Sequence, residues 1–454
     1  MSVPSAVVGH TQANRYAWYV VLLLTAAQMA SFTDRYLPSL LIEPLKADFQ
    51  LSDYQVGLLL GPAFALFYAT VGLPIGWLAD RWSRRGILCA GITIWCCMTV
   101  ASSVVATFIP LLCLRLGVGL GEATMSPCAI SLISDYFPRP QRPRALGVYM
   151  TGSGLGAGIA FLFVGPLVQW LSSRQPVHLG PLGAIPPWQS AFAVVGVPGL
   201  LLAALMFTVR EPARTEIQAM DRDPHKVPAF REVALYILAR WRGFGTLFLG
   251  SACLSTLSTL NVWNVSLFQR TWGWNVADVG KAVGILFFTA VPLGTAIVVR
   301  LTSRGAAAGH SDATVRALIV GLAIAVPGFA CYALMPNGSA AVGLLFVAFI
   351  GQAMVSAAAP VALTLITPGQ IRSQTVAIFY LVISLVSLMI GPPPVGWLVD
   401  FMGDPHTLRY AISIEATVVG VPSLIIVILG LKHYARAVLR LPSAPAPTPQ
   451  TRTP

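Results

Sequence analysis

The stretch GWLADRWSRRG, from Gly76 to Gly86, separates two long apolar runs and decides how this chain folds. It sets a small residue, an acid and several arginines in a fixed order. A glycine such as Gly76 lets a neighbouring helix approach closely. The carboxylate of Asp80 can accept hydrogen bonds from the amides at a helix N-terminus or from an arginine. We expect Arg81, Arg84 and Arg85 to bind lipid phosphates and to hold the next loop on the same side, so that the stretch forms a gate.

The composition is that of a membrane protein. The chain has 454 residues, of which 56% are hydrophobic and 10% charged. Soluble domains carry roughly 25% charged residues, so this chain has too little polar surface to face water alone. A helix needs about 20 mainly apolar residues to cross a bilayer, and twelve such runs are present. They begin near Tyr16, Tyr54, Gly86, Phe108, Arg144, Trp188, Phe244, Val279, Val315, Ala340, Thr375 and Thr407.

A charged central segment divides the twelve runs six and six. We therefore predict an all-α, multi-pass integral membrane protein with five regions. These are an N-terminal tail (1–14), an N-terminal six-helix bundle (15–209), a central linker with room for one amphipathic helix (210–242), a C-terminal six-helix bundle (243–434) and a disordered tail (435–454).

The basic residues predict the orientation. Cytoplasmic loops are enriched in lysine and arginine. If the N-terminus is inside, the loops on that side hold most of the 29 basic residues. Only five fall in outer loops, namely Lys46, Arg174, Arg270, Lys281 and Arg409. The net charge of +12 is thus a membrane-orientation signal and does not indicate a nucleic-acid partner. Both termini are expected to be cytoplasmic.

The two halves of the sequence resemble each other. The stretch Ser126–Tyr149 is similar in pattern to Ala359–Tyr380. Each has a proline followed by small and β-branched residues, a basic loop and an aromatic residue. The first joins the fourth span to the fifth, and the second joins the tenth to the eleventh. Two related bundles with a binding site between them are typical of transporters that work by alternating access.

Five charged residues lie well inside the predicted spans: Asp34, Arg35, Arg115, Glu122 and Glu415. Charges within a membrane span are costly and commonly functional. Arg115 and Glu122 lie seven residues apart, on one face of the fourth span and about 10 Å apart along its axis. Asp34 and Arg115 fall at similar depth, which predicts an ion pair between them with Glu122 deeper. Glu415 is alone in the twelfth span and is expected to be structural.

This arrangement of charges suggests proton coupling. A buried carboxyl group is either ionised beside a cation or protonated without one. If a rocking motion moves Arg115 between Asp34 and Glu122, the proton changes its holder. Arg35 could then bind an anionic group in the cavity. The alternative is a fixed salt-bridge network that only stabilises the bundle.

The second half offers neutral polar groups. Asn261, Trp263 and Asn264 lie in the seventh span, and Tyr380 opens the eleventh. Such donors and aromatic rings suit substrate recognition, although hydrogen bonding between helices is an equal alternative. The stretch Gly294–Gly305 is a degenerate copy of the gate without an acid.

The gate stretch resembles the signature loop G-x-L-x-D-R-x-x-R-R of the major facilitator superfamily. FTDRYLPSLLIEPLKADFQLSD, RLGVGLGEATMSPCAISLISDYFP and WQSAFAVVGVPGLLLA further resemble the spinster-like branch, mainly over the first half. The resemblance implies the superfamily fold and a proton-coupled carrier of lysophospholipid-like amphipathic molecules. It implies protonation of Asp34 and Glu122, with Arg35 and Arg115 as charge partners. In the superfamily the gate steadies the outward-facing state.

Other readings remain open at this stage. Symporters for hexuronates and related sugar acids share the D-R and G-E-A residues, which makes a small organic anion the second candidate substrate. A membrane-embedded enzyme or a channel is disfavoured, since no catalytic cluster accompanies the four charges of the first half. The seven cysteines and six histidines lack ligand spacing, so neither a metal nor a cofactor is expected. We expect a monomer in a bacterial inner membrane.

Overall fold

The computed structural model describes residues 15–79, 81–138, 140–178, 184–212, 230–368 and 371–439. Asp80 lies outside these ranges, as do the N-terminal tail, most of the central linker and the end of the C-terminal tail. The described part contains twelve helical segments long and apolar enough to cross a membrane. Every one begins within three residues of its predicted start. The prediction of an all-α, twelve-span membrane protein is confirmed.

The first six spans are built from nine α-helices, two 3-10 turns and one π-helical turn. In order, they are α1 (Arg15–Leu40); α3 (Asp53–Leu60) with α4 (Pro62–Ala79); α5 (Arg84–Ala101) with the 3-10 turn Ser102–Val104; α6 (Phe108–Glu122) with α7 (Met125–Tyr136); α8 (Arg142–Ile159), the π-helical turn Ala160–Val164 and α9 (Gly165–Ser172); and α10 (Ser190–Met206), which follows the 3-10 turn Pro187–Gln189.

The last six spans follow the same plan. They are α13 (Trp241–Thr259), the 3-10 turn Leu260–Trp263 and α14 (Asn264–Trp272); α15 (Val276–Ala307); α16 (Ala313–Cys331) with the turn Tyr332–Leu334; α17 (Gly338–Leu365); α18 (Arg372–Ile390) with α19 (Pro392–Met402); and α20 (Leu408–Leu439), which follows the turn Pro405–Thr407. Helix α20 therefore continues past residue 434, into the region predicted as tail.

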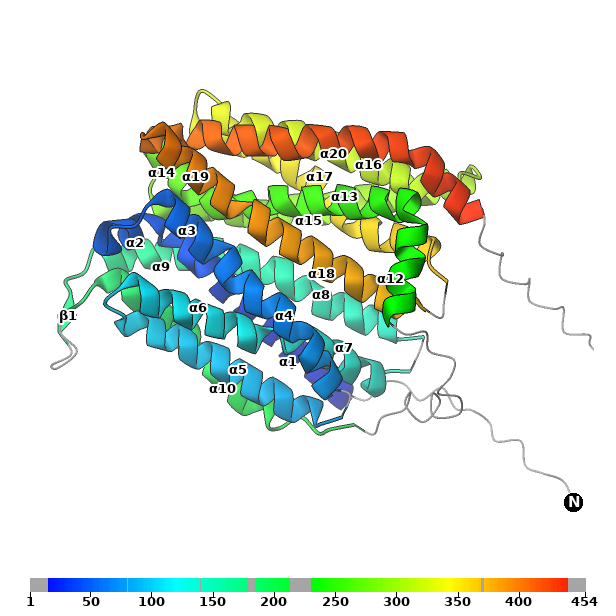
Figure 1. Ribbon diagram of the computed structural model, residues 1–454. Helices are drawn as coiled ribbons and strands as arrows, with labels where there is room; N and C mark the ends of the chain where they lie inside the picture. Colours follow the sequence, from blue (N-terminus) through cyan, green and yellow to red (C-terminus); the bar gives the residue numbers. More distant parts are fainter. Residues whose placement is uncertain are drawn as a thin grey trace, which may run out of the picture.

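Three elements lie outside the spans. Helix α2 (Ile42–Phe49) connects the first two spans. A two-residue hairpin, β1 (Val177–His178) paired with β2 (Ala184–Ile185), is a small exception to the all-helical prediction. Helix α12 (Phe230–Ala239) falls in the predicted linker and runs across the ends of the spans instead of along them (Figure 1). The linker therefore does contain one short helix.

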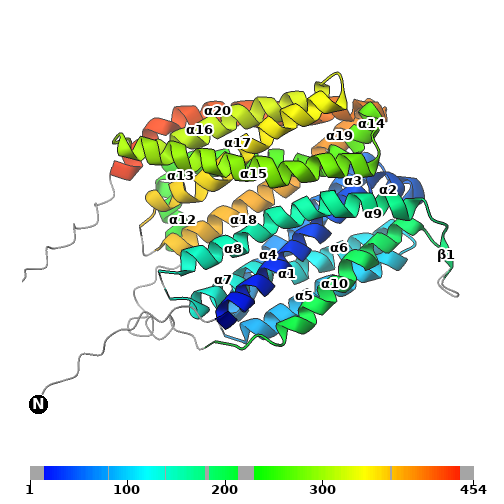
Figure 2. The ribbon, with the colours of Figure 1, turned by 180° about the vertical axis from the view of Figure 1, so that it is seen from behind.

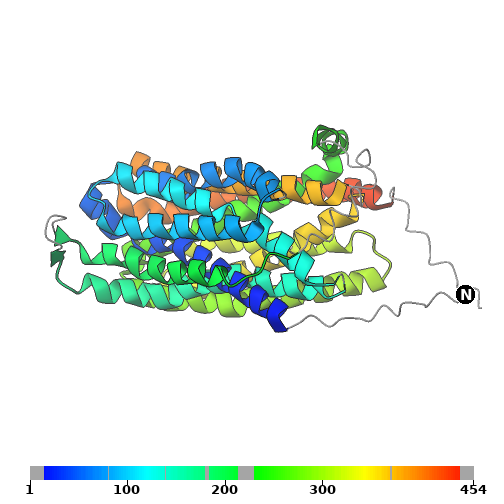
Figure 3. The same cartoon turned by 90° about the horizontal axis from the view of Figure 1, so that it is seen from below.

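The spans form two bundles, one from each half of the chain. The first half, from blue α1 to green α10, lies below the second half, from green α13 to red α20, in Figure 1, and the view from behind in Figure 2 agrees. The first and last described residues lie at the same end of the molecule, whereas the β1 hairpin lies at the other (Figure 3). We call the hairpin end the outer end and the opposite end the inner end. Exposed apolar side chains such as Leu429 and Phe401, 68% and 76% exposed, suit contact with lipid.

Candidate transport site

The predicted pair between Asp34 and Arg115 is present inside the N-terminal bundle. Nη1 of Arg115, on α6, lies 3.3 Å from Oδ1 of Asp34 on α1. Oδ2 of Asp34 accepts a 2.7 Å hydrogen bond from Thr99, and Arg115 also donates to Thr99 and Ser102 at 3.3 Å. Both charged side chains are almost fully buried. The pair is therefore fixed from several sides by α1, α5 and α6.

Glu122 has a different partner from the one predicted. Nη2 of Arg35 donates a 2.6 Å bond to Oε2 of Glu122, the last residue of α6. The two acids thus have separate arginines in this conformation, and the movement of Arg115 from Asp34 to Glu122 stays a prediction. Consecutive residues on a helix point about 100° apart. Asp34 and Arg35 therefore face different neighbours. The sequence analysis compared only the depths of residues in the first and fourth spans, and depth does not give the direction in which a side chain points.

The Arg35–Glu122 pair is less completely buried than the other pair. The side chain of Arg35 is 25% exposed, while that of Glu122 is fully buried. Oε1 of Glu122 is buried and accepts no well-formed hydrogen bond from the described residues. A proton could add to that oxygen without breaking the bond from Arg35, which goes to Oε2. This second pair, with one member reaching an accessible space, is the better candidate for a group that changes charge.

Aromatic rings surround the guanidinium of Arg35. Its central carbon lies 4.5 Å from the ring centre of Phe32, 4.3 Å from that of Phe64 and 5.3 Å from that of Tyr68. Each such contact stabilises a cation by about 0.5–2 kcal/mol, depending on its desolvation. The rings can hold Arg35 in place when Glu122 is neutral. Phe64 and Tyr68 were missed from the sequence, because nothing in the chain order places α4 beside Arg35. Phe32 was also missed, although it lies three residues before Arg35 on α1, a spacing that puts the two side chains on one face of the helix.

The predicted recognition residues of the second half divide into two groups. Tyr380 is 51% exposed and lines a cavity of about 160 Å³ between α13, α17 and α18. Asn261, Trp263 and Asn264 are buried inside the C-terminal bundle. There the amide of Asn264 donates to Asn261 at 3.1 Å and accepts from Tyr332 at 2.8 Å.

The expectation that these three buried residues line the cavity is therefore wrong for this conformation. The indole of Trp263 donates to the carbonyl of Pro392 at 3.3 Å. Asn264 has partners on both sides, Asn261 and Tyr332, as buried polar groups commonly do. Serines that the sequence analysis did not single out, Ser251, Ser255, Ser384 and Ser387, line the Tyr380 cavity instead.

In the gate stretch, Arg84 is a buried bridge and does not face lipid. Its guanidinium donates to Asp135 at the end of α7, to Ser131 at 2.9 Å and to Glu211 at 2.8 Å. Arg85 donates from its backbone amide to Glu211 at 2.9 Å. The predicted lipid contact is therefore wrong for Arg84, which instead joins the inner ends of three spans.

The carboxyl group of Glu211 makes the stability of this Arg84 bridge depend on pH. Burial opposes ionisation of its carboxyl, but hydrogen bonds from the Arg85 amide, Arg84 and Ser83 hold its pKa below the ordinary value. Its stabilising effect is thus complete above about pH 4.3, the ordinary pKa of glutamic acid, and is lost as the pH falls through the lowered pKa.

We expect Glu211→Gln to lower stability at pH 7 by about 1–3 kcal/mol, the usual value of a charge-assisted hydrogen bond. The difference from the wild type should narrow under acid conditions. Thermal unfolding of the two purified proteins across a pH series measures this. Asp278→Asn, in an exposed pair 3.8 Å from Lys281, is the control and should change little. A Glu211→Gln deficit that is the same at every pH contradicts the role given to the carboxylate.

Two other gate residues face open space. A side chain added at Gly76 would meet no described atom within 4 Å, so the predicted close helix approach is absent in this conformation. Arg81 is exposed and stacks on Trp77, with 3.8 Å between its guanidinium carbon and the ring centre. Arg81 is thus exposed, and its contact with lipid phosphates stays a prediction. The inner gate stretch is open at Gly76 in this structure.

The outer end, by contrast, is closed by a latch between the two bundles. Asp400, near the end of α19, accepts hydrogen bonds from the backbone amides of Asp53 and Tyr54 at 2.9 and 2.8 Å, and so caps α3. A Cβ at Gly396 would lie 2.2 Å from the carbonyl oxygen of Asp53. The glycine and the acid thus bring α19 directly against the N-terminus of α3.

Ion pairs complete the outer latch. Arg270 on α14 donates to Asp53 and to Glu43, both at 2.8 Å, and Lys46 lies 2.6 Å from Asp53. The sequence carried a signal for this latch that was missed: GWLVD at Gly396–Asp400 differs in one residue from GWLAD at the start of the gate stretch. With its outer end closed and Gly76 open, the structure has the features of an inward-facing conformation.

The family model of the Major Facilitator Superfamily matches residues 24–350. The chain belongs to the Major Facilitator Superfamily. Among solved structures, a bacterial homologue of the human lysosomal transporter Spinster, in an inward-facing and unoccupied conformation, is 26% identical with a TM-score of 0.75. That match covers 96% of this chain and 100% of the homologue. A D-xylose–proton symporter structure, 17% identical with a TM-score of 0.65, shares the fold.

Curated relatives of the chain include transport proteins and spinster proteins. An MFS-type efflux pump of Mycolicibacterium smegmatis is 28% identical over 67% of each chain. The protein spinster of Drosophila melanogaster is 24% identical over 77% of this chain and 56% of its own length. A probable L-galactonate transporter of Escherichia coli is 28% identical over 47% of this chain and 44% of its own. The protein is therefore a spinster-like, multi-pass membrane transporter, with the fold of carriers and not of enzymes.

Proposed function

We propose that this protein is a proton-coupled secondary transporter that moves an amphipathic, lipid-like anion by alternating access. The observation that carries the proposal is the Arg35–Glu122 pair, with its fully buried acid and a partly exposed arginine. While Glu122 is ionised it occupies Arg35. Once Glu122 is protonated, the guanidinium is free to bind an anionic group of the substrate. Proton and substrate thereby favour the same state of the carrier, which is the condition for coupling.

The surroundings of Arg35 favour an amphipathic substrate. Phe32, Phe64 and Tyr68 give the cation an apolar collar, and the Tyr380 cavity across the interface mixes serines with apolar side chains. An anionic head group at Arg35 with a hydrocarbon tail along these surfaces satisfies both features. The Spinster-like neighbours support this class.

A sugar acid is the second candidate, supported by the galactonate-transporter relative. Such a substrate would need hydrogen-bond partners along its whole length. The serines Ser251, Ser255, Ser384 and Ser387 near Tyr380 are the groups that could provide them.

The pseudo-symmetry of the latches supports alternating access. In the closed outer latch, Gly396 gives close approach and Asp400 caps a facing helix. We propose that Gly76 and Asp80 of the nearly identical GWLAD stretch make the corresponding contacts at the inner end when that end closes. The basic residues of the inner loops support a cytoplasmic inner end, and with it cytoplasmic termini. A bacterial inner membrane is the location that the bacterial homologue favours.

Transport into proteoliposomes tests the proposal. A thermal-shift series with lysophospholipids and hexuronates at two pH values first selects the substrate class, and we expect stabilisation by a lysophospholipid. Uptake of that substrate should then rise when a pH gradient is imposed and fall when a protonophore removes it. Uptake that ignores the gradient would reject the coupling, and stabilisation by hexuronates alone would select the sugar-acid alternative.

A further inference from the structure

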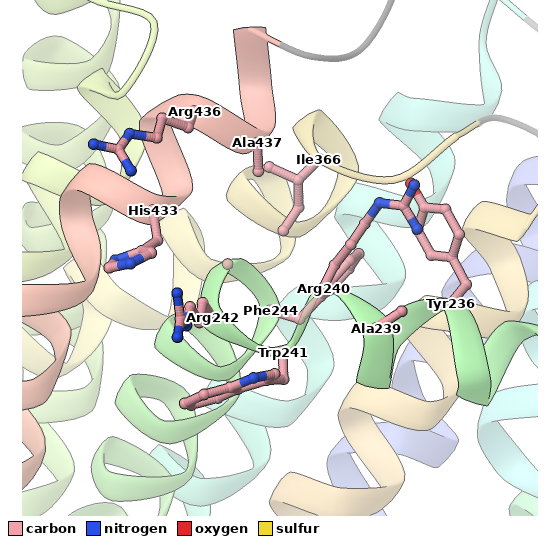
Figure 4. A pocket seen from close by; sticks show the side chains of 11 residues that line it. Tyr236, Ala239, Arg240, Trp241, Arg242, Phe244, Ile366, His433, Arg436 and Ala437 are labelled. Carbon is pink, nitrogen blue, oxygen red and sulfur yellow. The ribbon is translucent and has the colours of Figure 1, made fainter.

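A basic pocket lies at the inner end of the C-terminal bundle, away from the transport site. It has a volume of about 450 Å³ and lies between α12, the N-terminus of α13 and the end of α20. The residues that give it its character are Tyr236, Arg240, Trp241, Arg242, His433 and Arg436. Figure 4 shows Arg242, His433 and Arg436 on one side of the pocket, with Arg240 and Tyr236 on the other.

The cations of this pocket are not neutralised within the described part of the chain. No described carboxylate lies within ion-pair distance of Arg240, Arg242 or Arg436. Arg240 stacks on the ring of Tyr236, with 3.9 Å between its guanidinium carbon and the ring centre, which orients it at the pocket wall. Three arginines around one cavity, with no carboxylate among its lining residues, produce a positive potential that favours an anion.

The backbone adds to this potential. Helix α13 has 19 residues, and its N-cap residue, Arg240, provides no side-chain cap. The first amides of a helix carry partial positive charge and commonly bind phosphate. The first three residues of α13, Trp241 to Gly243, line the same cavity as the arginines. The amide of Gly243 already donates to the carbonyl of Arg240 at 3.0 Å, so the partial positive charge of the helix end adds to the arginine charges chiefly through the first two amides.

Apolar side chains around the pocket suggest where the ligand comes from. Leu235, Leu238 and Trp241 are 52%, 64% and 62% exposed beside it, on α12 and at the start of α13. Exposed leucines and a tryptophan next to arginines are typical of a helix at the membrane–water interface. Helix α12 also runs across the ends of the spans, as expected of such a helix (Figure 1). At the membrane–water interface, anionic phospholipids present phosphate groups next to this pocket.

We propose that this pocket binds the phosphate of an anionic ligand, with an anionic phospholipid head group as the source that the exposed apolar residues favour. Basic pockets between spans on the cytoplasmic side commonly bind such head groups. The proposal is independent of the transported substrate, because none of the residues of the pocket belongs to the Arg35–Glu122 site or lines the Tyr380 cavity.

Thermal shift of the full-length protein in neutral detergent tests the proposal. Four additions are compared: dioleoyl-phosphatidylglycerol, dioleoyl-phosphatidylcholine, glycerol 1-phosphate and inorganic phosphate. The pocket variant is Arg240→Gln/Arg242→Gln/Arg436→Gln. The matched control, Arg300→Gln/Arg304→Gln/Arg372→Gln, removes three exposed inner arginines elsewhere, so both variants lose the same charge.

We expect phosphatidylglycerol, but not phosphatidylcholine, to raise the unfolding temperature of the wild type and the control. In the pocket variant the concentration needed should increase on the order of a hundredfold, from roughly fivefold per arginine. An equal shift with glycerol 1-phosphate or inorganic phosphate would assign the site to a soluble phosphate. Equal shifts by phosphatidylglycerol in all three proteins, or no shift by any addition in the wild type, overturn the proposal.

A second measurement serves if the glutamine variant does not fold. Phosphatidylglycerol with brominated chains quenches nearby tryptophans, and the difference between wild type and Trp241→Phe isolates the signal of Trp241. We expect this signal to be quenched at lower mole fractions of brominated phosphatidylglycerol than of brominated phosphatidylcholine. Equal quenching by the two lipids would reject a specific head-group site.

Discussion

Replacement of Glu122 by glutamine is expected to abolish proton-driven accumulation while substrate exchange continues. The amide has the shape of the protonated carboxyl but carries no titrating group. Arg35 is then held by Phe32, Phe64 and Tyr68 whatever the pH, and the substrate can still bind. With one proton coupled per substrate, a gradient of one pH unit supports about tenfold accumulation. In the variant the internal and external concentrations should become equal.

The matched control for this prediction is Glu415→Gln. Glu415 is also buried in a span, and its Oε1 accepts no hydrogen bond from the described residues. Glu415 lies in α20, apart from the Arg35–Glu122 pair, so the Glu415→Gln variant should accumulate substrate as the wild type does. Proteoliposomes with an imposed pH gradient measure accumulation, and counterflow without a gradient measures exchange. Glu122→Gln protein that still accumulates substrate tenfold would reject Glu122 as the coupling group.

The second large effect is expected at the outer latch. A methyl group added by Gly396→Ala would lie 2.2 Å from the carbonyl oxygen of Asp53, so α19 and α3 must separate. Forcing extra volume into a packed contact costs about 1–3 kcal/mol. That cost falls only on the outer-closed state, and it should move the population towards outward-facing molecules by about 5- to 150-fold.

Labelling of a cysteine placed in the outer half of the interface measures this shift. The rate should rise in Gly396→Ala and stay unchanged in Gly343→Ala, because a methyl group at Gly343 on α17 meets no described atom within 4 Å. Unchanged labelling in Gly396→Ala would mean that the latch does not control the outer gate. A bulky residue at Gly76 should act in the opposite direction if the inner gate closes in the same way.

The sequence was sufficient for features that depend on hydrophobicity and on residue spacing within one helix. Apolar runs located every span, because lipid imposes a minimum length on each. The Asp34–Arg115 pair was predictable because depth in the membrane follows from distance to the helix end. The superfamily and its spinster-like branch were predictable from the gate stretch and the first and fourth spans.

Features that depend on how helices rotate and pack were not predicted. The direction of Arg35 around α1 decides that it meets Glu122, and depth alone does not contain that direction. Asn264 donates to Asn261 inside the bundle, and in sequence such a pair looks the same as two residues facing a substrate. The outer latch joins residues more than 340 positions apart, and the sequence does not tell which conformation of the carrier the structure holds. In this conformation, with the outer end closed, a side chain at Gly76 would meet no described atom within 4 Å.

The most direct test of the coupling claim is the proton exchange that accompanies substrate binding. Purified protein in weakly buffered detergent solution, with a pH indicator present, is mixed with the substrate selected by thermal shift. Because binding of the anion to Arg35 releases Glu122 to be protonated, we predict that the wild type takes up protons and that Glu122→Gln takes up none. Equal proton uptake by both proteins, or none by the wild type at saturating substrate, would contradict the role of the Arg35–Glu122 pair.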